Sequence, residues 1–178
     1  SLGAEMATIM SHALAAGLFY RVLAPLKDKK TLRICLLGAV LPDFDVIAFR
    51  FGIPYEAMLG HRGFTHSILF ALVFAAFCLL FYRGRPKKWR YFLLFFLSPM
   101  SHALLDMLTN GGLGVGLFIP FSSERFFFPF TPIEVSPIGA GFFSQRGLQV
   151  LISEFFLIGI PCLIIFLIHW FFSSRRQN

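Results

Sequence analysis

Residues 89–108 have the sequence WRYFLLFFLSPMSHALLDML, an apolar stretch that carries His102 and Asp106 close to its end. A helix of about 20 apolar residues crosses a hydrocarbon core about 30 Å thick, so this stretch predicts a membrane span. Ionisable groups inside a span are costly, which makes them candidates for function. Because they are four residues apart, His102 and Asp106 lie on one face of the predicted helix and can reach one ion.

The rest of the chain has the same character. Of its 178 residues, 57% are hydrophobic, 14% are charged and 25 are Phe, whereas a soluble domain has about 45–50% apolar and about 25% charged residues. The excess lies in five stretches of spanning length: 7–24, 32–49, 65–82, 89–108 and 150–172. The sequence therefore predicts an all-α polytopic membrane protein, a bundle of about five transmembrane helices, and excludes soluble domains, a disordered tail and a secreted disulfide scaffold.

The segments outside these stretches complete the predicted organisation. We expect residues 1–5 to be a cloning remnant before a native Met6, and residues 6–178 to form one membrane-embedded domain. Residues 110–149 are rich in Gly and then in Phe and Pro, which predicts a long structured outer loop that folds back into the membrane interface. The odd number of cysteines and their apolar surroundings are typical of buried hydrophobes rather than disulfides; they are Cys35, Cys78 and Cys162.

The net charge of +7 comes from basic residues at the ends of the apolar stretches. That placement indicates membrane topology and not nucleic-acid binding. Twelve of the sixteen basic residues flank the first and third connections or form the carboxyl-terminal tail. The positive-inside rule then predicts an amino terminus outside and a carboxyl terminus in the cytoplasm of a bacterial inner membrane.

Seven ionisable residues approach one depth, near the outer face, in this topology. They are His12, Asp43, Asp45, His61, His66, His102 and Asp106. Imidazole and carboxylate together suit zinc or, with more oxygen ligands, manganese or magnesium. Seven candidates exceed the four that a tetrahedral zinc needs, so one or two ions are predicted. Taken alone, His12 is typical of a helix–helix hydrogen bond, and Asp43 and Asp45 also suit a cation or proton relay.

Three motifs carry a family resemblance: PDFD at 42–45, HRGFTHS at 61–67 and SHALLD at 101–106. Together with His12 they resemble the YdjM-like family of membrane-bound, metal-dependent hydrolases, and residues 120–138 look like that family's long loop. The resemblance covers nearly the whole chain after Met6 and implies a hydrolase with a divalent metal. The order of the ligands is also similar, more loosely, to that of zinc-dependent phospholipase C and P1-type nucleases.

The favoured function is hydrolysis of a lipid headgroup linkage, first of all a phosphoester, at the outer leaflet. Arg62 and Arg125 are expected to bind the phosphate, and Arg62, Asp45 and His66 are the candidate catalytic residues. The expected partner is a membrane lipid, and the sequence does not define an oligomeric state. Thr65 is expected to cap the third helix, with His66 in its first turn.

Three alternatives stay open at this point: hydrolysis of a lipid ester or amide, transport of a divalent metal or proton, and a scaffold with structural zinc. A transporter needs polar groups that continue to the inner face, and the sequence below Asp43 and His102 offers almost none. A structural zinc site is a closed set of four ligands, whereas seven candidates leave room for water.

Overall fold

The computed structural model describes residues 8–24, 28–135 and 144–175. The predicted cloning remnant, residues 1–5, and the part of the outer loop at 136–143 lie outside the described residues. Regular structure in the described residues is helical, apart from isolated bridges between Thr109 and Ile133 and between Val115 and Phe126. The helices are α1 (Ile9–Leu23), α2 (Lys29–Val40), η1 (Leu41–Phe51), η2 (Phe64–His66), α3 (Ile68–Leu80), α4 (Lys88–Met107), α5 (Gln145–Glu154), η4 (Phe155–Gly159) and α6 (Ile160–Arg175).

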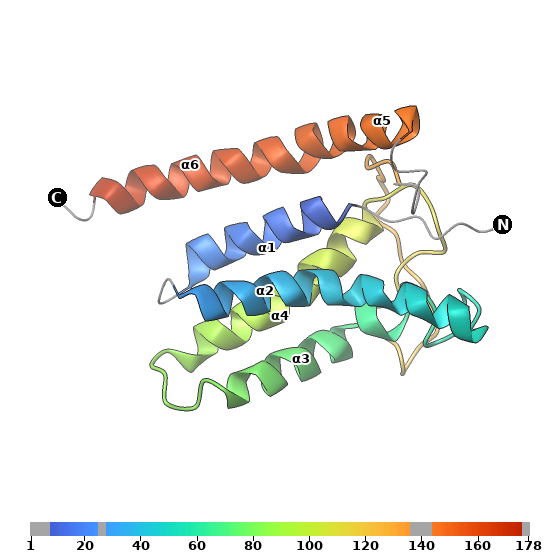
Figure 1. The fold of residues 1–178 in the computed structure, drawn as a ribbon, viewed down its shortest axis with the longest axis horizontal. Coiled ribbons are helices and arrows are strands. Elements are labelled where there is room, and N and C mark those ends of the chain that lie inside the picture. Colours follow the sequence, from blue (N-terminus) through green and yellow to red (C-terminus); the bar gives the residue numbers. More distant parts are fainter. Residues whose placement is uncertain (1–7, 25–27, 136–143, 176–178) are drawn as a thin grey trace.

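The helices α1 to α4 form an antiparallel bundle, and α5, η4 and α6 make one long rod beside α1 (Figure 1). The rod is held to α1 by Glu154, which accepts hydrogen bonds from Thr8 N at 2.6 Å and from Ser11 Oγ at 2.8 Å. An apolar cluster packs within the bundle; it comprises Tyr20, Cys35, Ala75, Cys78, Tyr82, Tyr91, Leu94 and Phe95. Cys35 and Cys78 are thus buried hydrophobes, as predicted, and Cys162 is half-buried; all three are free thiols.

The predicted second span changes its helix type part of the way along. The α-helix ends at Val40, and the chain tightens into the 3₁₀ helix η1, which Gly52 ends with a φ of 73°. Pro42 explains the change, because it has no N–H for the α-helical bond to Gly38. Asp43 and Asp45 therefore lie on 3₁₀ backbone, directly after the change.

The third helix begins later than predicted. Its N-cap is Ser67, whose Oγ accepts a hydrogen bond from Phe70 N at 3.1 Å, and not Thr65. His66 lies in the short 3₁₀ turn η2 that precedes α3. Thr65 is unavailable as a cap because its hydroxyl donates to Asp45 Oδ2 at 2.7 Å. The local sequence offered two hydroxyl caps, and a tertiary contact decided between them.

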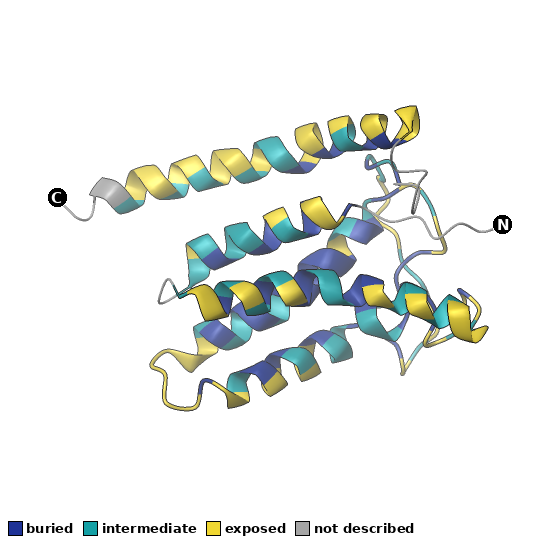
Figure 2. Ribbon diagram, viewed as in Figure 1, coloured by how far each residue is buried: buried dark blue, intermediate teal, exposed yellow. Residues whose placement is uncertain are grey.

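One helix among the described residues is long and apolar enough to cross a membrane. It runs over Gln145–Ser173, with a mean hydropathy of 2.6, and corresponds to the predicted fifth span. The apolar helices α1 and α3 have 15 and 13 residues, fewer than the predicted first and third spans. The α5–α6 rod is exposed along most of its length (Figure 2). The five predicted stretches are thus helical, whereas one helix among the described residues is both long and apolar enough to cross a membrane.

The described part of the loop predicted over residues 110–149 covers the end of the bundle at which α1 begins and α4 ends (Figure 1). Backbone hydrogen bonds tie it there, from Phe128 N to Met107 O at 2.9 Å and from Gly116 N to Arg62 O at 2.9 Å. A third bond, from Ile68 N to Leu117 O at 3.0 Å, joins the loop to the start of α3. The predicted structured loop is therefore present over residues 110–135.

Candidate metal centre

Four of the seven predicted ligands converge in the bundle. Asp43, His66, His102 and Asp106 each offer one ligand atom, and these atoms lie within 4.8 Å of one another. They come from η1, η2 and α4, and all four residues are buried. The spacing of four in α4 places His102 and Asp106 on one face, as predicted.

The distances among these atoms suit one ion. His102 Nε2 lies 3.2 Å from Asp43 Oδ1 and 3.5 Å from Asp106 Oδ2, and His66 Nε2 lies 3.3 Å from Asp106 Oδ2. Ligand atoms about 2.0–2.2 Å from a tetrahedral zinc lie about 3.3–3.6 Å from one another. The two Nε2 atoms are buried without a hydrogen-bond partner among the described residues. The donor set therefore fits a divalent ion.

Each of the two imidazoles is oriented through its other nitrogen. His102 Nδ1 contacts the carbonyl oxygen of Ala39 at 2.7 Å, and His66 Nδ1 lies 3.2 Å from Asp45 Oδ2. Metal-binding histidines usually have such a second partner, which fixes the ring orientation and the tautomer. Pro42 contributes here, since it has no N–H to offer to the Ala39 carbonyl three residues back, as a 3₁₀ helix would require.

Asp45 and His61 lie beside the four-residue cluster. Asp45 Oδ1 is 2.6 Å from His61 Nδ1, and Asp45 Oδ2 accepts from Arg62 N at 3.1 Å in addition to Thr65 Oγ1. Both oxygens of Asp45 contact the HRGFTHS segment, and Asp45 lies outside the set of four; its predicted role as a metal ligand stays a prediction. His61 is buried, and its Nε2 has no hydrogen-bond partner among the described residues.

His12 completes the group from α1. Its ring stacks on His102, with centroids 3.6 Å apart and an interplanar angle of 15°. His12 Nε2 is 3.8 Å from Asp106 Oδ1, and neither ring nitrogen has a hydrogen-bond partner among the described residues. His12 is therefore at the site, as predicted, although outside the set of four.

The side chain of Arg62 contacts groups within the protein. Its side chain is fully buried, with Nε 3.3 Å from Asp106 Oδ2, and it donates to Gly111 O at 2.7 Å and to Thr109 Oγ1 at 2.9 Å. Arg62 also has a φ of 57°, an uncommon left-handed conformation for a residue with a side chain. The guanidinium thus contacts the candidate ligand Asp106 within the protein, and its predicted role as a phosphate-binding group stays a prediction.

Arg125 is likewise an internal brace. Its guanidinium donates to His61 O at 3.0 Å and to Tyr55 O at 3.0 Å, with longer bonds to Gly114 O and Ala57 O. It also lies over the Tyr55 ring, 5.6 Å from the centroid. Burial raises the pKa of Tyr55, so its hydroxyl stays protonated. Arg125 donates to these carbonyls because irregular backbone needs donors, and its predicted contact with substrate stays a prediction.

The contacts that support the four-residue cluster are hard to predict from the sequence. Thr109 follows Asp106 by three residues, just past the end of α4, and this spacing is a signal that could have been used. Ala39 acts through its carbonyl, which no side-chain motif reveals. A Cβ at Gly63 would meet Met58 O at 2.4 Å. The glycine is therefore required by a close approach of backbone.

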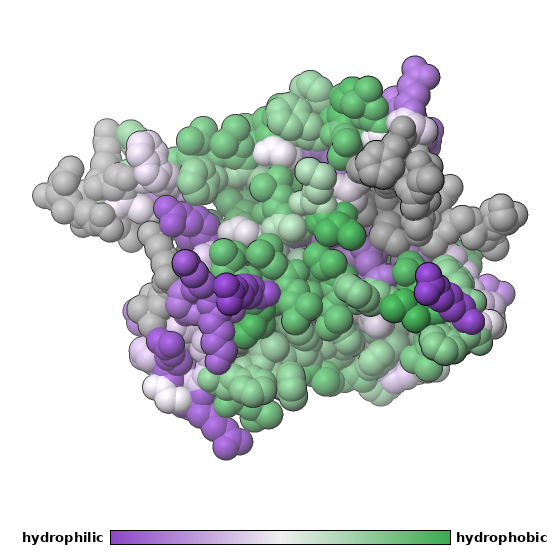
Figure 3. Space-filling view, viewed as in Figure 1, coloured by the Kyte–Doolittle hydropathy of each residue, from purple (hydrophilic) through white to green (hydrophobic). Residues whose placement is uncertain are grey.

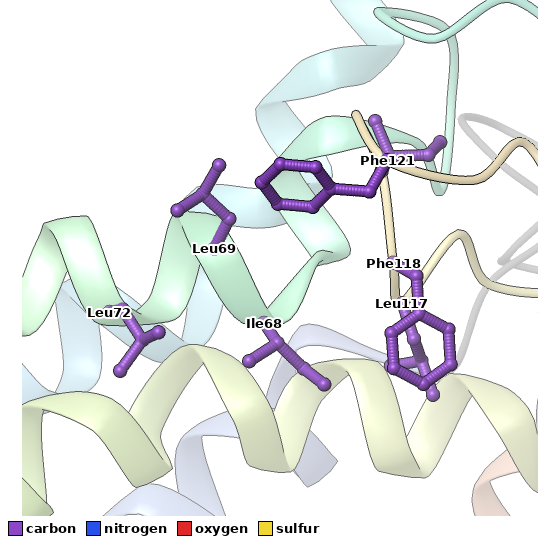
Figure 4. A pocket seen from close by; sticks show the side chains of 7 residues that line it. Ile68, Leu69, Leu72, Leu117, Phe118 and Phe121 are labelled. Carbon is purple, nitrogen blue, oxygen red and sulfur yellow. The ribbon is translucent and has the colours of Figure 1, made fainter.

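An apolar groove of about 250 Å³ lies beside this site and not at it (Figure 4). It runs between the start of α3 and the loop after α4, and the side chains labelled there are Ile68, Leu69, Leu72, Leu117, Phe118 and Phe121. Its lining has no ionisable residue. The chemistry of the protein is therefore concentrated in the His/Asp cluster.

The fold and the site define a helical protein with a helix of membrane-spanning length and a buried His/Asp centre of metal-binding type. The family described as YdjM inner membrane protein matches residues 6–176, and the chain belongs to this family. It is 38% identical to the inner membrane protein YbcI of Escherichia coli (strain K12) over 173 residues, which cover 93% of this chain and 98% of YbcI. No solved structure matches the chain. These similarities support an inner-membrane location.

Proposed function

We propose that the chain is a metal-dependent hydrolase that cleaves a headgroup linkage of a membrane lipid, a phosphoester in the first instance. The convergence of four buried donors at the spacing of one ion supports it most strongly. Asp43, His66, His102 and Asp106 would hold the ion, zinc first, with manganese or magnesium as alternatives. A bound divalent ion supplies Lewis-acid activation of water and of the scissile group.

The remaining residues of the centre have supporting roles in this proposal. Asp45 orients His61 and His66, and Arg62 holds Asp106 through a buried ion pair. His61 keeps its Nε2 available to hold a proton, because Asp45 engages the other ring nitrogen. His12 and His61 are the nitrogen donors left for a second ion.

The interior of the bundle favours an enzyme over a transporter. Below the site, the apolar cluster around Tyr82, Leu94 and Phe95 fills the space between the helices. The nearest buried hydroxyls are satisfied locally, with Ser98 donating to Leu94 O at 3.0 Å and Ser101 to Ser98 O at 2.8 Å. Among the described residues, no continuous chain of polar side chains leads a cation or proton from the site to the other end of the bundle.

A lipid substrate suits the surroundings of the site. In the proposed topology α1, α2 with η1, α3, α4 and the α5–α6 rod all lie in the membrane, with the amino terminus outside. The site then lies towards the outer leaflet, at the depth of the headgroup linkages. The apolar groove in Figure 4 begins at Ile68, two residues after His66, and suits an acyl chain.

The metal and the reaction are tested on the purified full chain. We expect elemental analysis to find at least one divalent ion in the wild type and almost none in His102→Ala. The matched control is His169→Gln, since His169 lies in α6 away from the cluster. Retention of stoichiometric metal by His102→Ala would contradict the ligand assignment.

The bond cleaved is tested with phospholipid vesicles. Phosphorus NMR detects release of a phosphorylated headgroup, and fatty-acid analysis detects ester cleavage in the same sample. We expect headgroup release that stops on chelation and returns with zinc, and that His102→Ala lacks. Fatty acid as the product would replace the phosphoester by the lipid ester, and no product of either kind would contradict the hydrolase.

The orientation is tested by cysteine labelling in cells. A cysteine replacing exposed Leu59, near the site, should react with an impermeant reagent from outside, and one replacing Arg85 should not. Cys162→Ser supplies the background, because the other two thiols are buried. The reverse pattern would place the site at the cytoplasmic face.

A further inference from the structure

Basic side chains gather at the end of the bundle opposite the His/Asp centre, where the α1–α2 and α3–α4 connections lie. We call this surface the basic end; its members are Lys29, Lys30, Arg33, Arg83, Arg85, Lys87, Lys88 and Arg90. All are exposed except Arg90, which is half-buried. The space-filling view shows a hydrophilic patch at this end, directly against the apolar body of the molecule (Figure 3).

The chain provides almost no negative charge to balance these residues. The nearby carboxylate is that of Asp28, which accepts hydrogen bonds from Thr31 N at 2.8 Å and Thr31 Oγ1 at 2.9 Å. Among the residues that the structure describes, the ion pairs of arginine and lysine are Arg62 with Asp106 and Arg146 with Glu134. Neither pair belongs to the basic end, so its positive potential extends outward.

The two connections are joined beneath this surface. Thr31 Oγ1 and Tyr82 Oη lie 2.9 Å apart and are buried, and the Tyr20 hydroxyl donates to Asp28 O at 3.0 Å. Tyr82 packs on Tyr91 with ring centroids 4.7 Å apart. The basic residues of α2 and those between α3 and α4 are therefore held side by side as one surface.

Aromatic rings lie among the cations. Lys30 Nζ is 5.7 Å from the Phe81 centroid and 5.3 Å from that of Tyr82, and Arg90 Cζ is 5.3 Å from the ring of Trp89. Phe81 and Trp89 are 61% and 63% exposed. Exposed aromatic rings beside basic side chains, at the border of an apolar surface, are typical of the membrane interface. A nucleic-acid surface needs no such apolar border.

We propose that the basic end binds the headgroups of anionic phospholipids, with the lipid phosphate among the lysine and arginine side chains and the acyl chains along the adjoining apolar helices. Basic residues next to membrane helices attract anionic lipids. The proposal does not depend on the hydrolase, because the surface lies at the other end of the bundle from the His/Asp centre.

The test uses the purified full chain in detergent with equal amounts of phosphatidylglycerol and phosphatidylcholine. Lipid that remains bound after size-exclusion chromatography is extracted and quantified by mass spectrometry. We compare the wild type with the double variant Arg33→Gln/Lys88→Gln. The matched control is Arg50→Gln/Arg146→Gln, which removes the same charge from exposed residues outside the basic end.

We expect the wild type to retain phosphatidylglycerol in excess over phosphatidylcholine. At low ionic strength the basic-end variant should bind phosphatidylglycerol about 25-fold more weakly, at about fivefold for each basic residue. The control should change by less than about twofold, because its charges are outside the basic end. Equal retention of the two lipids, or equal losses in the two variants, would overturn the proposal. Displacement of phosphatidylglycerol by an oligothymidylate at lower concentration would overturn it in favour of nucleic acid.

Discussion

The two ends of the bundle are both rich in ionisable groups, and they differ in burial. At the site end the histidines and carboxylates are buried, and each of Asp43, Asp45 and Asp106 faces a histidine or an arginine. At the basic end seven of the eight cations are exposed, with one nearby carboxylate. A buried charge needs a partner inside the protein, whereas an exposed charge is solvated by water or lipid headgroups.

This difference predicts where a substitution is costly. The site end is a network, in which the loss of one group leaves another buried group without its partner. The basic end is a set of nearly independent charges, in which one loss changes little within the protein. The following variants test the contrast, from the largest expected effect to the smallest.

Asp106→Ala should have the largest effect, because Asp106 contacts Arg62, His66 and His102. Removing one partner of a buried ion pair costs about 3–5 kcal/mol of unfolding free energy. We expect a fall in Tm of about 6–20 °C and loss of bound metal, measured by thermal melts in detergent and by elemental analysis. Glu124→Ala, at an exposed acid, is the control. A Tm within about 2 °C of the wild type, with full metal, would contradict the network.

Arg62→Lys separates bracing from substrate binding. Lysine keeps the positive charge but cannot donate to both Gly111 O and Thr109 Oγ1 as the guanidinium does. The loss of these hydrogen bonds should lower the unfolding free energy by about 1.5–3 kcal/mol. Tm and metal content should fall together, while Arg146→Lys at the surface leaves both unchanged. If Arg62→Lys lost only phospholipid hydrolysis, with Tm and metal content preserved, the guanidinium would bind substrate after all.

Asp45→Asn should weaken the metal centre without removing it. Asp45 orients His61 and His66, and loss of such an outer partner lowers metal affinity by about 10–100-fold. The affinity is measured by competition with a chelator. Asp28→Asn is the matched control at the basic end, where the carboxylate caps α2, so only stability should change. Unaltered affinity in Asp45→Asn would remove Asp45 from the centre.

Lys29→Gln should have the smallest effect. Its side chain is exposed at the basic end and has no ion pair among the described residues. Surface substitutions of this kind change the unfolding free energy by about 0.5 kcal/mol or less. We expect unchanged metal content and a Tm within about 2 °C of the wild type. A fall in Tm as large as that of Asp106→Ala would show that the side chains of the basic end depend on one another as much as those of the site end.

Much of the architecture was predictable because it depends on local composition and spacing. The apolar stretches became helices, the loop at 110–135 became structured, and His102 and Asp106 shared a face of α4. The helix boundaries were less predictable. Residues 32–49 became an α-helix followed by a 3₁₀ helix, and α3 began at Ile68 after a Ser67 cap. These boundaries follow from Pro42 and from the engagement of Thr65 by Asp45.

The contacts of Arg62 and Arg125 could not be predicted from residue type. A guanidinium can donate to a phosphate, a carboxylate or a carbonyl. The sequence does not show which of these acceptors lies nearest to the guanidinium in the folded protein. In the structure Arg62 contacts Asp106, 44 residues away, and Arg125 contacts the carbonyls of residues 55–61. Both were assigned to substrate because their internal partners are distant in the chain.

The sequence by itself determined that the protein is helical and apolar, that its ionisable residues near one end are histidine and aspartate, and that it belongs to an inner-membrane family. These properties depend on residue type and on spacings within one helix. The tertiary structure alone decided that Asp43, His66, His102 and Asp106 converge while Asp45 and Arg62 support them. The reason is that distances between segments are set by how the helices pack, and a shift of one ångström decides whether an oxygen binds an ion or orients its ligand.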